Sequence, residues 1–203
     1  MLNLTKLDLP QKQKQIVSSA LELFQRFGIR RISIEELCQT AGVSKMTFYK
    51  YYNNKNDLVK FIWGTGIEQG MQRFEEIKTM DIPFEKKLRL VLQLKDETTT
   101  KISHDFALDY FSASDDLNEF FQGLIHKTIT SFLQFIKEAQ ANGDVRPDLK
   151  AEFLLMVINH IQSMIKDKNL INLYPTYHDF VMEVNNFIFY GILSRPEPEQ
   201  NGS

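Results

Sequence analysis

Residues 33–58 of this 203-residue chain read SIEELCQTAGVSKMTFYKYYNNKNDL, and this stretch decides the N-terminal fold. Ser33 is a predicted helix N-cap, and Glu36 follows three residues later in the spacing of a capping box. Ala41-Gly42-Val43 predicts a tight turn, because glycine takes a positive φ that other residues resist. Ser44 then predicts the N-cap of a second short helix. Two short capped helices joined by a three-residue turn make a helix-turn-helix.

Helical periodicity continues on both sides of this stretch. From residue 11 to residue 27 the apolar residues recur at the i, i+3, i+4 spacing of one helical face, and Gly28 ends that helix. Asn54 with Asp57 predicts the cap of a further helix. The stretch therefore lies within a bundle of helices and is not an isolated hairpin.

The rest of the chain also predicts helices, because no segment alternates with the period of a strand. We expect an all-α fold of about nine helices: an N-terminal three-helix DNA-binding module and a C-terminal helical ligand-binding and dimerisation domain. The expected domains are residues 1–56 and 57–195, followed by a flexible tail at 196–203. The expected later helices are 83–101, 104–111, 114–141, 149–166 and 176–193, with a loop through Pro175.

Charge is divided unevenly between the two parts. The first 60 residues hold ten Lys/Arg against five Asp/Glu, a net charge of +5, whereas the remainder holds 14 against 21, a net charge of -7. A basic module on an acidic body suits a polyanion that binds at one end. Chance asymmetry between two surfaces is the alternative reading of the charge alone.

The composition also narrows the class of protein. The single cysteine, Cys38, allows no internal disulfide framework, and no secretory leader is recognisable. The longest fully apolar run, residues 153–158, is far shorter than the ~20 residues of a membrane span. We therefore expect a cytoplasmic protein with no membrane association.

The second short helix carries most of the residues that we expect to contact double-stranded DNA. In a helix-turn-helix the first helix braces the second, which presents residues to base edges in the major groove. Val43, Phe48 and Tyr52 are expected to face inward, and cationic, hydroxyl and aromatic groups to face outward. The outward set is Lys45, Met46, Thr47, Tyr49, Lys50 and Tyr51, and the predicted DNA-binding set adds Ser33 and Ser44.

The stretch resembles the TetR family of transcriptional repressors. The resemblance covers residues of about 12 to 62, including Ala20-Leu-Glu-Leu-Phe and Gly28. Two residues depart from the family pattern: Met46 stands where a small residue is common, and Tyr52 stands where Phe is commoner. The base preference therefore stays open.

The resemblance implies roles for single residues. It implies that Thr47 and Tyr49 contact phosphate or bases and that Lys45 and Met46 lie in the groove. Lys55, at the start of the fourth helix, would grip a phosphate. It further implies a homodimer whose last two long helices form a four-helix bundle with those of the partner.

The C-terminal domain is rich in Phe, Tyr and Met, which fill cores and also line apolar ligand pockets. For each such residue, core packing is the alternative reading. The predicted effector pocket consists of Trp63, Phe106, Tyr110, Phe111, Phe132, Met156, His160 and Met164. The predicted dimer interface consists of Phe153, Val157, Ile161, Val184, Phe187 and Ile188.

Other patterns give weaker indications. Gly64-Thr-Gly66-Ile-Glu-Gln-Gly70 has the wrong spacing and no preceding strand for a nucleotide-binding loop, so we read it as glycines that soften or closely pack a helix. The four histidines are scattered, so we expect no metal site and no cofactor. Cys38 is expected to be a buried apolar residue, with a thiol switch as the alternative. No catalytic constellation is recognisable, and we expect no enzyme.

The sequence therefore predicts a ligand-responsive transcriptional regulator. We expect a repressor that binds a palindromic operator as a dimer and is released by a small-molecule effector, through a shift of the fourth helix. Activation in place of repression stays open. The alternative is a helical ligand-binding or scaffold protein whose helix-turn-helix contacts protein.

Overall fold

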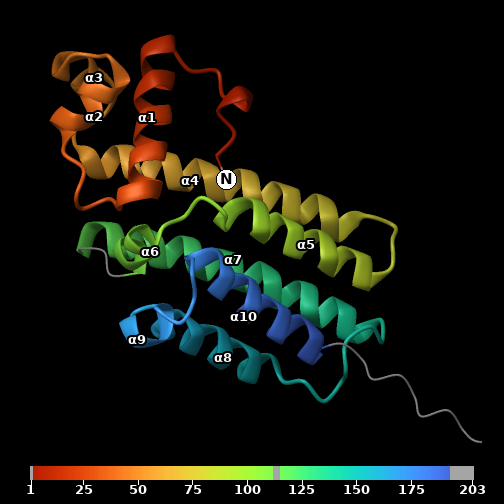
Figure 1. The fold of residues 1–203 in the computed structure, drawn as a ribbon. Coiled ribbons are helices and arrows are strands. Elements are labelled where there is room, and N and C mark those ends of the chain that lie inside the picture. Colours follow the sequence, from red (N-terminus) through yellow and green to blue (C-terminus); the bar gives the residue numbers. More distant parts are fainter. Residues whose placement is uncertain (1, 112–114, 193–203) are drawn as a thin grey trace, which may run out of the picture.

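The computed structural model describes residues 2–111 and 115–192, and this part of the chain is helical without strands, which confirms the all-α prediction. Figure 1 shows α1, α2 and α3 gathered at one end, above α4, while α5, α7, α8 and α10 lie beside and below it. The elements are a 3-10 helix η1 (Leu4–Lys6), α1 (Gln11–Phe27), α2 (Ile34–Ala41), α3 (Lys45–Tyr51), α4 (Lys55–Thr79), α5 (Phe84–Thr99), α6 (His104–Phe111), α7 (Asp115–Ala141), α8 (Ala151–Met164), α9 (Lys168–Ile171) and α10 (Tyr177–Ile192).

Local hydrogen bonds fix the helix-turn-helix. The Ser33 hydroxyl accepts from the Glu36 amide at 3.1 Å, and the Ser44 hydroxyl accepts from the Thr47 amide at 3.1 Å. Gly42 between the two helices has φ 62° and ψ 38°, the left-handed region that favours glycine. Its amide donates to the last carbonyls of α2, so α2 ends where the turn requires.

The helix α4 joins the two parts without a linker. It begins at Lys55, so the domain boundary expected after residue 56 falls within its first turn. A Cβ at Gly66 would lie 3.5 Å from the Leu2 backbone nitrogen, so the glycine lets the N-terminal segment lie close against α4. The Asn3 amide then donates to the Gln69 side chain at 2.6 Å. Close packing is therefore what Gly66 provides, whereas a Cβ at Gly70 would meet nothing within 4 Å in the described part of the chain.

Three apolar clusters form the core. The first cluster combines α1 to α4 with Phe106 of α6 and Phe121 of α7, so the module packs directly on the larger domain. The second cluster joins the far end of α4 to α5, α7, α8 and α10. The third cluster includes Ala107, Ile171 and Phe180 and holds the end of α8 against α6 and α10. One continuous scaffold thus connects both ends of the molecule.

The structure adds two short helices to those expected, the 3-10 helix η1 and the helix α9. Where a loop was predicted before Pro175, the one-turn helix α9 occurs. The Asp167 carboxylate accepts from the Asn169 amide at 2.9 Å, and Ile171 is buried, so a local cap and one apolar contact hold this turn. The predicted cap Ser114, the helix end at 193 and the tail at 196–203 lie outside the described residues. None of the described helices is long and apolar enough to cross a membrane.

Candidate functional site

The face of α3 that points away from the core is a dense contact surface. Phe48 is fully buried and anchors the helix, while Met46 is 83% and Tyr49 is 51% exposed. Lys45 and Lys50 are exposed on the same helix. The one-sided burial exposes an apolar, an aromatic and two cationic side chains on the outer face of α3.

Lys45 is paired within the chain. Its ammonium forms an ion pair with the Glu35 carboxylate of α2. The hydrogen bond to Glu35 raises the pKa of Lys45, and the same bond lowers the pKa of Glu35. Both side chains are exposed, so water and salt weaken this pair. A DNA phosphate that binds Lys45 must compete with Glu35.

The other predicted contact residues lie in mixed environments. Thr47 is half-buried, and its hydroxyl lies 3.0 Å from the Ser44 hydroxyl, so both belong to the helix cap. The Ser33 cap is exposed, and its hydroxyl hydrogen can still be donated. Tyr51 is half-buried and packs against the first cluster, so it faces less outward than expected. Tyr52 is buried, and its hydroxyl accepts from Gln13 Nε2 at 3.1 Å.

Lys55, for which a phosphate contact is predicted, makes hydrogen bonds within the chain. Its Nζ donates to the Ile29 carbonyl at 2.8 Å and to the Ile32 carbonyl at 2.9 Å. Burial lowers the pKa of Lys55, with a smaller opposing effect of Asp109. Lys55 therefore holds the loop between α1 and α2 in the free protein, because the loop carbonyls at the end of α1 have no helical partners.

A cavity of about 440 Å³ lies in the larger domain, a size usual for small-molecule sites. Helices α4, α5, α6, α7, α8 and α10 contribute to its walls, and so do Leu21 and Gln25 of α1 and Leu2 of the N-terminal segment. The lining is mostly apolar. Its polar members are Gln25, Lys95, Thr98, Thr99, Tyr110, Thr128, Ser131, Tyr177 and Asn185.

Four of the predicted pocket residues line this cavity: Trp63, Phe106, Tyr110 and Phe132. Two others do not, because Met156 is 63% exposed and His160 is exposed on the outer side of α8. Met164 packs against the third cluster. The side chain of Phe111 lies outside the described residues.

The predicted interface residues fall into two groups, one lining the cavity and one more exposed. Ile161, Val184 and Ile188 line the cavity of the single chain, and their role in a dimer interface stays a prediction. Helices α8 and α10 carry apolar side chains on more than one side, so periodicity alone does not separate residues that face the cavity from residues that face outward. Val157 is half-buried, whereas Phe153 and Phe187 are 52% and 77% exposed.

Lys95 is a charged residue of the cavity wall that was not predicted from the sequence. It lies on the face of α5 that also carries Val91, Leu94 and Thr98, at helical spacing along the cavity wall. A lysine in register with an apolar stripe was the available signal. Burial lowers the pKa of Lys95. Its side chain still has accessible surface, which we attribute to the cavity that it faces.

Helix α6 contacts both the cavity and the helix-turn-helix module. Phe106 lines the cavity and stacks on Trp63 of α4, with ring centroids 4.7 Å apart. On the same helix, Asp109 Oδ2 accepts from the Arg30 backbone amide at 2.8 Å, and Asp109 Oδ1 lies 3.3 Å from Arg30 Nε. A Cβ at Gly28 would lie 2.7 Å from Asp109 Oδ2, so the loop approaches α6 as closely as glycine allows.

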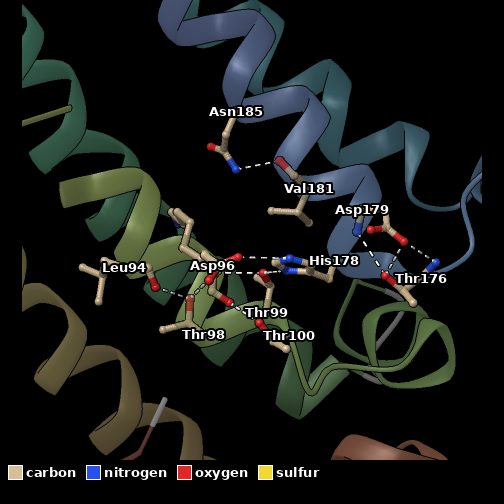
Figure 2. Close-up of polar contacts among 11 residues, drawn as sticks. Leu94, Asp96, Thr98, Thr99, Thr100, Thr176, His178, Asp179, Val181 and Asn185 are labelled. Carbon is tan, nitrogen blue, oxygen red and sulfur yellow. Dashed lines mark hydrogen bonds and ion pairs between the residues drawn. The ribbon is translucent and has the colours of Figure 1, made fainter. Parts of the chain in front are cut away.

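A polar link joins α5 to α10 beside the cavity, as Figure 2 shows. The Thr99 hydroxyl lies 2.8 Å from His178 Nδ1, and His178 Nε2 lies 3.2 Å from Asp96 Oδ1. This order of groups is similar to a catalytic triad. The Thr99 hydroxyl, however, also donates to the Lys95 carbonyl at 2.8 Å and is thus used within its own helix. The arrangement acts as an interhelical link.

The described residues could offer two further kinds of chemistry, a metal site and a reactive thiol. They contain no group of three or more His, Cys, Asp or Glu side chains that could hold a metal ion. Cys38 is 4% exposed, and burial raises the pKa of its thiol. A thiol with a raised pKa is mostly protonated and a poor nucleophile at neutral pH. The contact surface of α3 and the cavity are therefore the two functional candidates.

Comparison with known proteins gives a family match for the N-terminal part of the chain and a more distant relative over a longer stretch. Residues 16–62 match the family model described as bacterial regulatory proteins, tetR family. The relative named "Uncharacterized HTH-type transcriptional regulator YhgD", of Bacillus subtilis (strain 168), is 24% identical over 133 residues. These residues are 65% of this chain and 69% of that one.

Solved structures share the fold along nearly the whole chain. The fatty acid degradation regulator FadR from Bacillus halodurans has a TM-score of 0.71 at 15% identity, covering 93% of this chain and 100% of that one. FadR from Bacillus subtilis, solved in complex with stearoyl-CoA, has a TM-score of 0.66 at 17% identity. It covers 89% of this chain and 97% of that one. At these identities the likeness concerns the fold.

Proposed function

Since this chain carries the DNA-binding module of TetR-family transcriptional regulators, we propose that it is a repressor that binds a palindromic operator as a homodimer and is released by a small-molecule effector. The observation that carries the proposal is the one-sided burial of α3. Its buried Phe48 fixes the helix, while Lys45, Tyr49 and Lys50 face outward. Cationic and aromatic groups on a short helix suit phosphates and base edges.

The cavity supports the effector part of the proposal. Its size and apolar walls suit a small organic molecule rather than an ion. The fold relative from Bacillus subtilis was solved with stearoyl-CoA, a molecule with a long apolar chain. We propose that the effector of this chain is likewise largely apolar.

Two helices can carry a change in the cavity to the DNA-binding module. α4 lines the cavity through Trp63 and holds the α1–α2 loop through Lys55. α6 lines it through Phe106 and binds the same loop through Asp109. A ligand that separates Trp63 from Phe106 would move both attachments of that loop. The ligand acts only if it binds the released state more tightly than the DNA-bound state.

The second copy would cover the outer faces of α8 and α10. Both helices lie on the side of the domain away from α4 (Figure 1). Phe153 and Met156 of α8 and Phe187 and Tyr190 of α10 are more than half exposed. Large apolar side chains gathered in this way mark an interaction surface. A two-fold dimer would present two copies of α3 to successive major-groove faces, roughly 34 Å apart. We place this dimer in the cytoplasm, with the DNA.

The experiment is duplex selection from a random pool, followed by affinity measurements over a range of salt concentrations. Wild-type protein should retain an inverted repeat, and its log affinity should fall linearly with log salt. Lys45→Ala with Tyr49→Ala should weaken binding by about 100-fold or more, at about 1–3 kcal/mol per lost base contact, and flatten the slope. Lys86→Ala, an exposed lysine on α5, is the matched control. An unchanged salt slope in the double variant would favour the alternative of a protein-binding scaffold.

A further inference from the structure

The cavity wall has an unbalanced charge. Lys95 is the one cationic side chain among the described residues that line the cavity, and no carboxylate lines it with Lys95. No described residue accepts a hydrogen bond from the Lys95 ammonium or forms an ion pair with it. Burial of the ammonium among apolar groups lowers its pKa, with no neighbouring charge to offset the effect. An ammonium without a partner beside apolar groups is unfavourable, although only modestly so here because the Lys95 side chain keeps accessible surface, which we attribute to the cavity.

Two further polar groups in the same wall also lack partners. The Gln25 side chain and the Tyr177 hydroxyl are each buried, and neither makes a described hydrogen bond. Gln25 offers amide hydrogens and Tyr177 a hydroxyl hydrogen, so both can donate to an oxygen atom. Among the described residues, the fully enclosed side-chain atoms without a hydrogen-bond partner are Gln15 Oε1, His104 Nε2 and Arg146 Nε, so the polar atoms of Gln25 and Tyr177 keep some accessible surface for a ligand.

The remaining wall restricts the rest of a ligand. Most of the wall consists of apolar side chains, for example those of Phe74, Phe132, Phe189 and Ile158. A second charged group on the ligand would find no counter-ion there. One cation and a few polar donors in a mostly apolar wall therefore match a molecule with one charged end and a hydrocarbon body.

We propose that the effector is an apolar molecule with one anionic group, and that Lys95 binds this group within the cavity. The inference rests on the proposed function, because it specifies the chemistry of the effector. Binding would give the ammonium a partner and would place the hydrocarbon part against the apolar side chains of the cavity wall. The same contact would explain why a lysine occupies the apolar stripe of α5.

A matched pair of fluorescent probes tests this assignment. Anilinonaphthalene sulfonate and N-phenylnaphthylamine share one aromatic skeleton and differ by the sulfonate group. Wild-type protein should bind both, and Lys95→Met should bind the sulfonate about 10- to 100-fold more weakly, the usual range for one charge-assisted hydrogen bond. The affinity of Lys95→Met for the neutral probe should stay within about twofold. Lys95→Arg should restore most of the sulfonate affinity, because it keeps the charge.

The control is Lys86→Met, which removes an exposed lysine from the same helix and should change neither probe affinity. Equal sulfonate affinity in wild-type protein and Lys95→Met would overturn the proposal, and so would equal losses for both probes. A wild-type protein that binds only the neutral probe would overturn it as well. The proposed function fails separately, if wild-type protein shows no salt-dependent duplex binding while the probe results stand.

The anionic group of the natural effector could be a carboxylate or a phosphate ester, which share the chemistry that Lys95 recognises. Displacement of the bound sulfonate by decanoate and by decyl phosphate distinguishes the two. Decan-1-ol serves as the uncharged competitor. Stronger displacement by either anion than by the alcohol, lost in Lys95→Met, supports the proposal. Equal displacement by all three would contradict it.

Discussion

Helix α3 and helix α5 each present a lysine to a candidate binding partner, but their surroundings differ in every respect. Lys45 lies on an exposed surface, its pKa is raised by its bond to Glu35, and its partner is ten residues away. Lys95 lies in a wall of apolar groups, its pKa is lowered by burial, and it has no partner among the described residues. A surface cation can exchange one partner for another at little cost. A cavity cation needs a specific partner supplied by a ligand.

The largest expected effect comes from removing the support of the exposed surface. Phe48→Ala should lower the free energy of unfolding by about 3–5 kcal/mol, because Phe48 is fully buried and its loss leaves a cavity. Urea unfolding measures this change. Met46→Ala on the same helix, at 83% exposure, should change stability by less than about 0.5 kcal/mol. Equal effects of the two variants would mean that α3 is not packed as described.

The second prediction concerns Asp109, which connects α6 beside the cavity to the loop of the DNA-binding module. Asp109→Ala should lower stability by about 1–3 kcal/mol, because it removes a half-buried acceptor from the Arg30 amide. It should also reduce the extent to which a cavity ligand weakens DNA binding, while affinity for the ligand itself persists. Anisotropy titrations of duplex DNA with and without the ligand measure this coupling. Asp144→Ala, at an exposed position outside the contact, should leave the coupling unchanged.

The third prediction concerns the effect of the Lys95 charge on stability. Lys95→Met should raise stability at pH 7 by roughly 1 kcal/mol, a modest value because the side chain keeps accessible surface. The unfolded chain holds the lysine proton up to its ordinary pKa, and the folded chain releases it at a lower pH. The stability of wild-type protein should therefore gain on that of the variant as pH rises toward 10.5.

Thermal melts of both proteins from pH 7 to pH 10 check this difference. Tyr110 and Tyr177 line the same cavity, but burial raises the pKa of both hydroxyls, so they stay protonated over this range. A constant difference in Tm between the two proteins across the range would contradict a buried, titrating Lys95.

The smallest expected effect concerns the partner of Lys45. Glu35→Gln removes the carboxylate that competes with DNA for the Lys45 ammonium. Duplex affinity should rise by about two- to fivefold at low salt, and the gain should shrink as salt screens the charge. Glu119→Gln, an exposed carboxylate on α7, is the control. A loss of affinity in Glu35→Gln would show that Glu35 positions Lys45 for DNA rather than withholding it.

The helix-turn-helix was predictable because its determinants are local. Ser33 and Ser44 cap helices through amides three residues away, and Gly42 supplies the left-handed turn. The family resemblance could be recognised from the same stretch. For the cavity, the sequence indicated Trp63 and Phe106 but also placed Met156 in it, because aromatic and Met residues serve equally in cores, pockets and interfaces.

The sequence by itself therefore determined the helical class, the bounds of most helices and the short helix that carries the exposed contacts. Hydrogen bonds and apolar periods within a few residues fix those features. Only the tertiary structure decided that Lys95 enters a cavity and that Ile161 and Val184 line it. It likewise decided that Asp109 meets a loop 79 residues away. These facts depend on which helices pack together, and burial, pairing and pKa follow from neighbours that are distant in the chain.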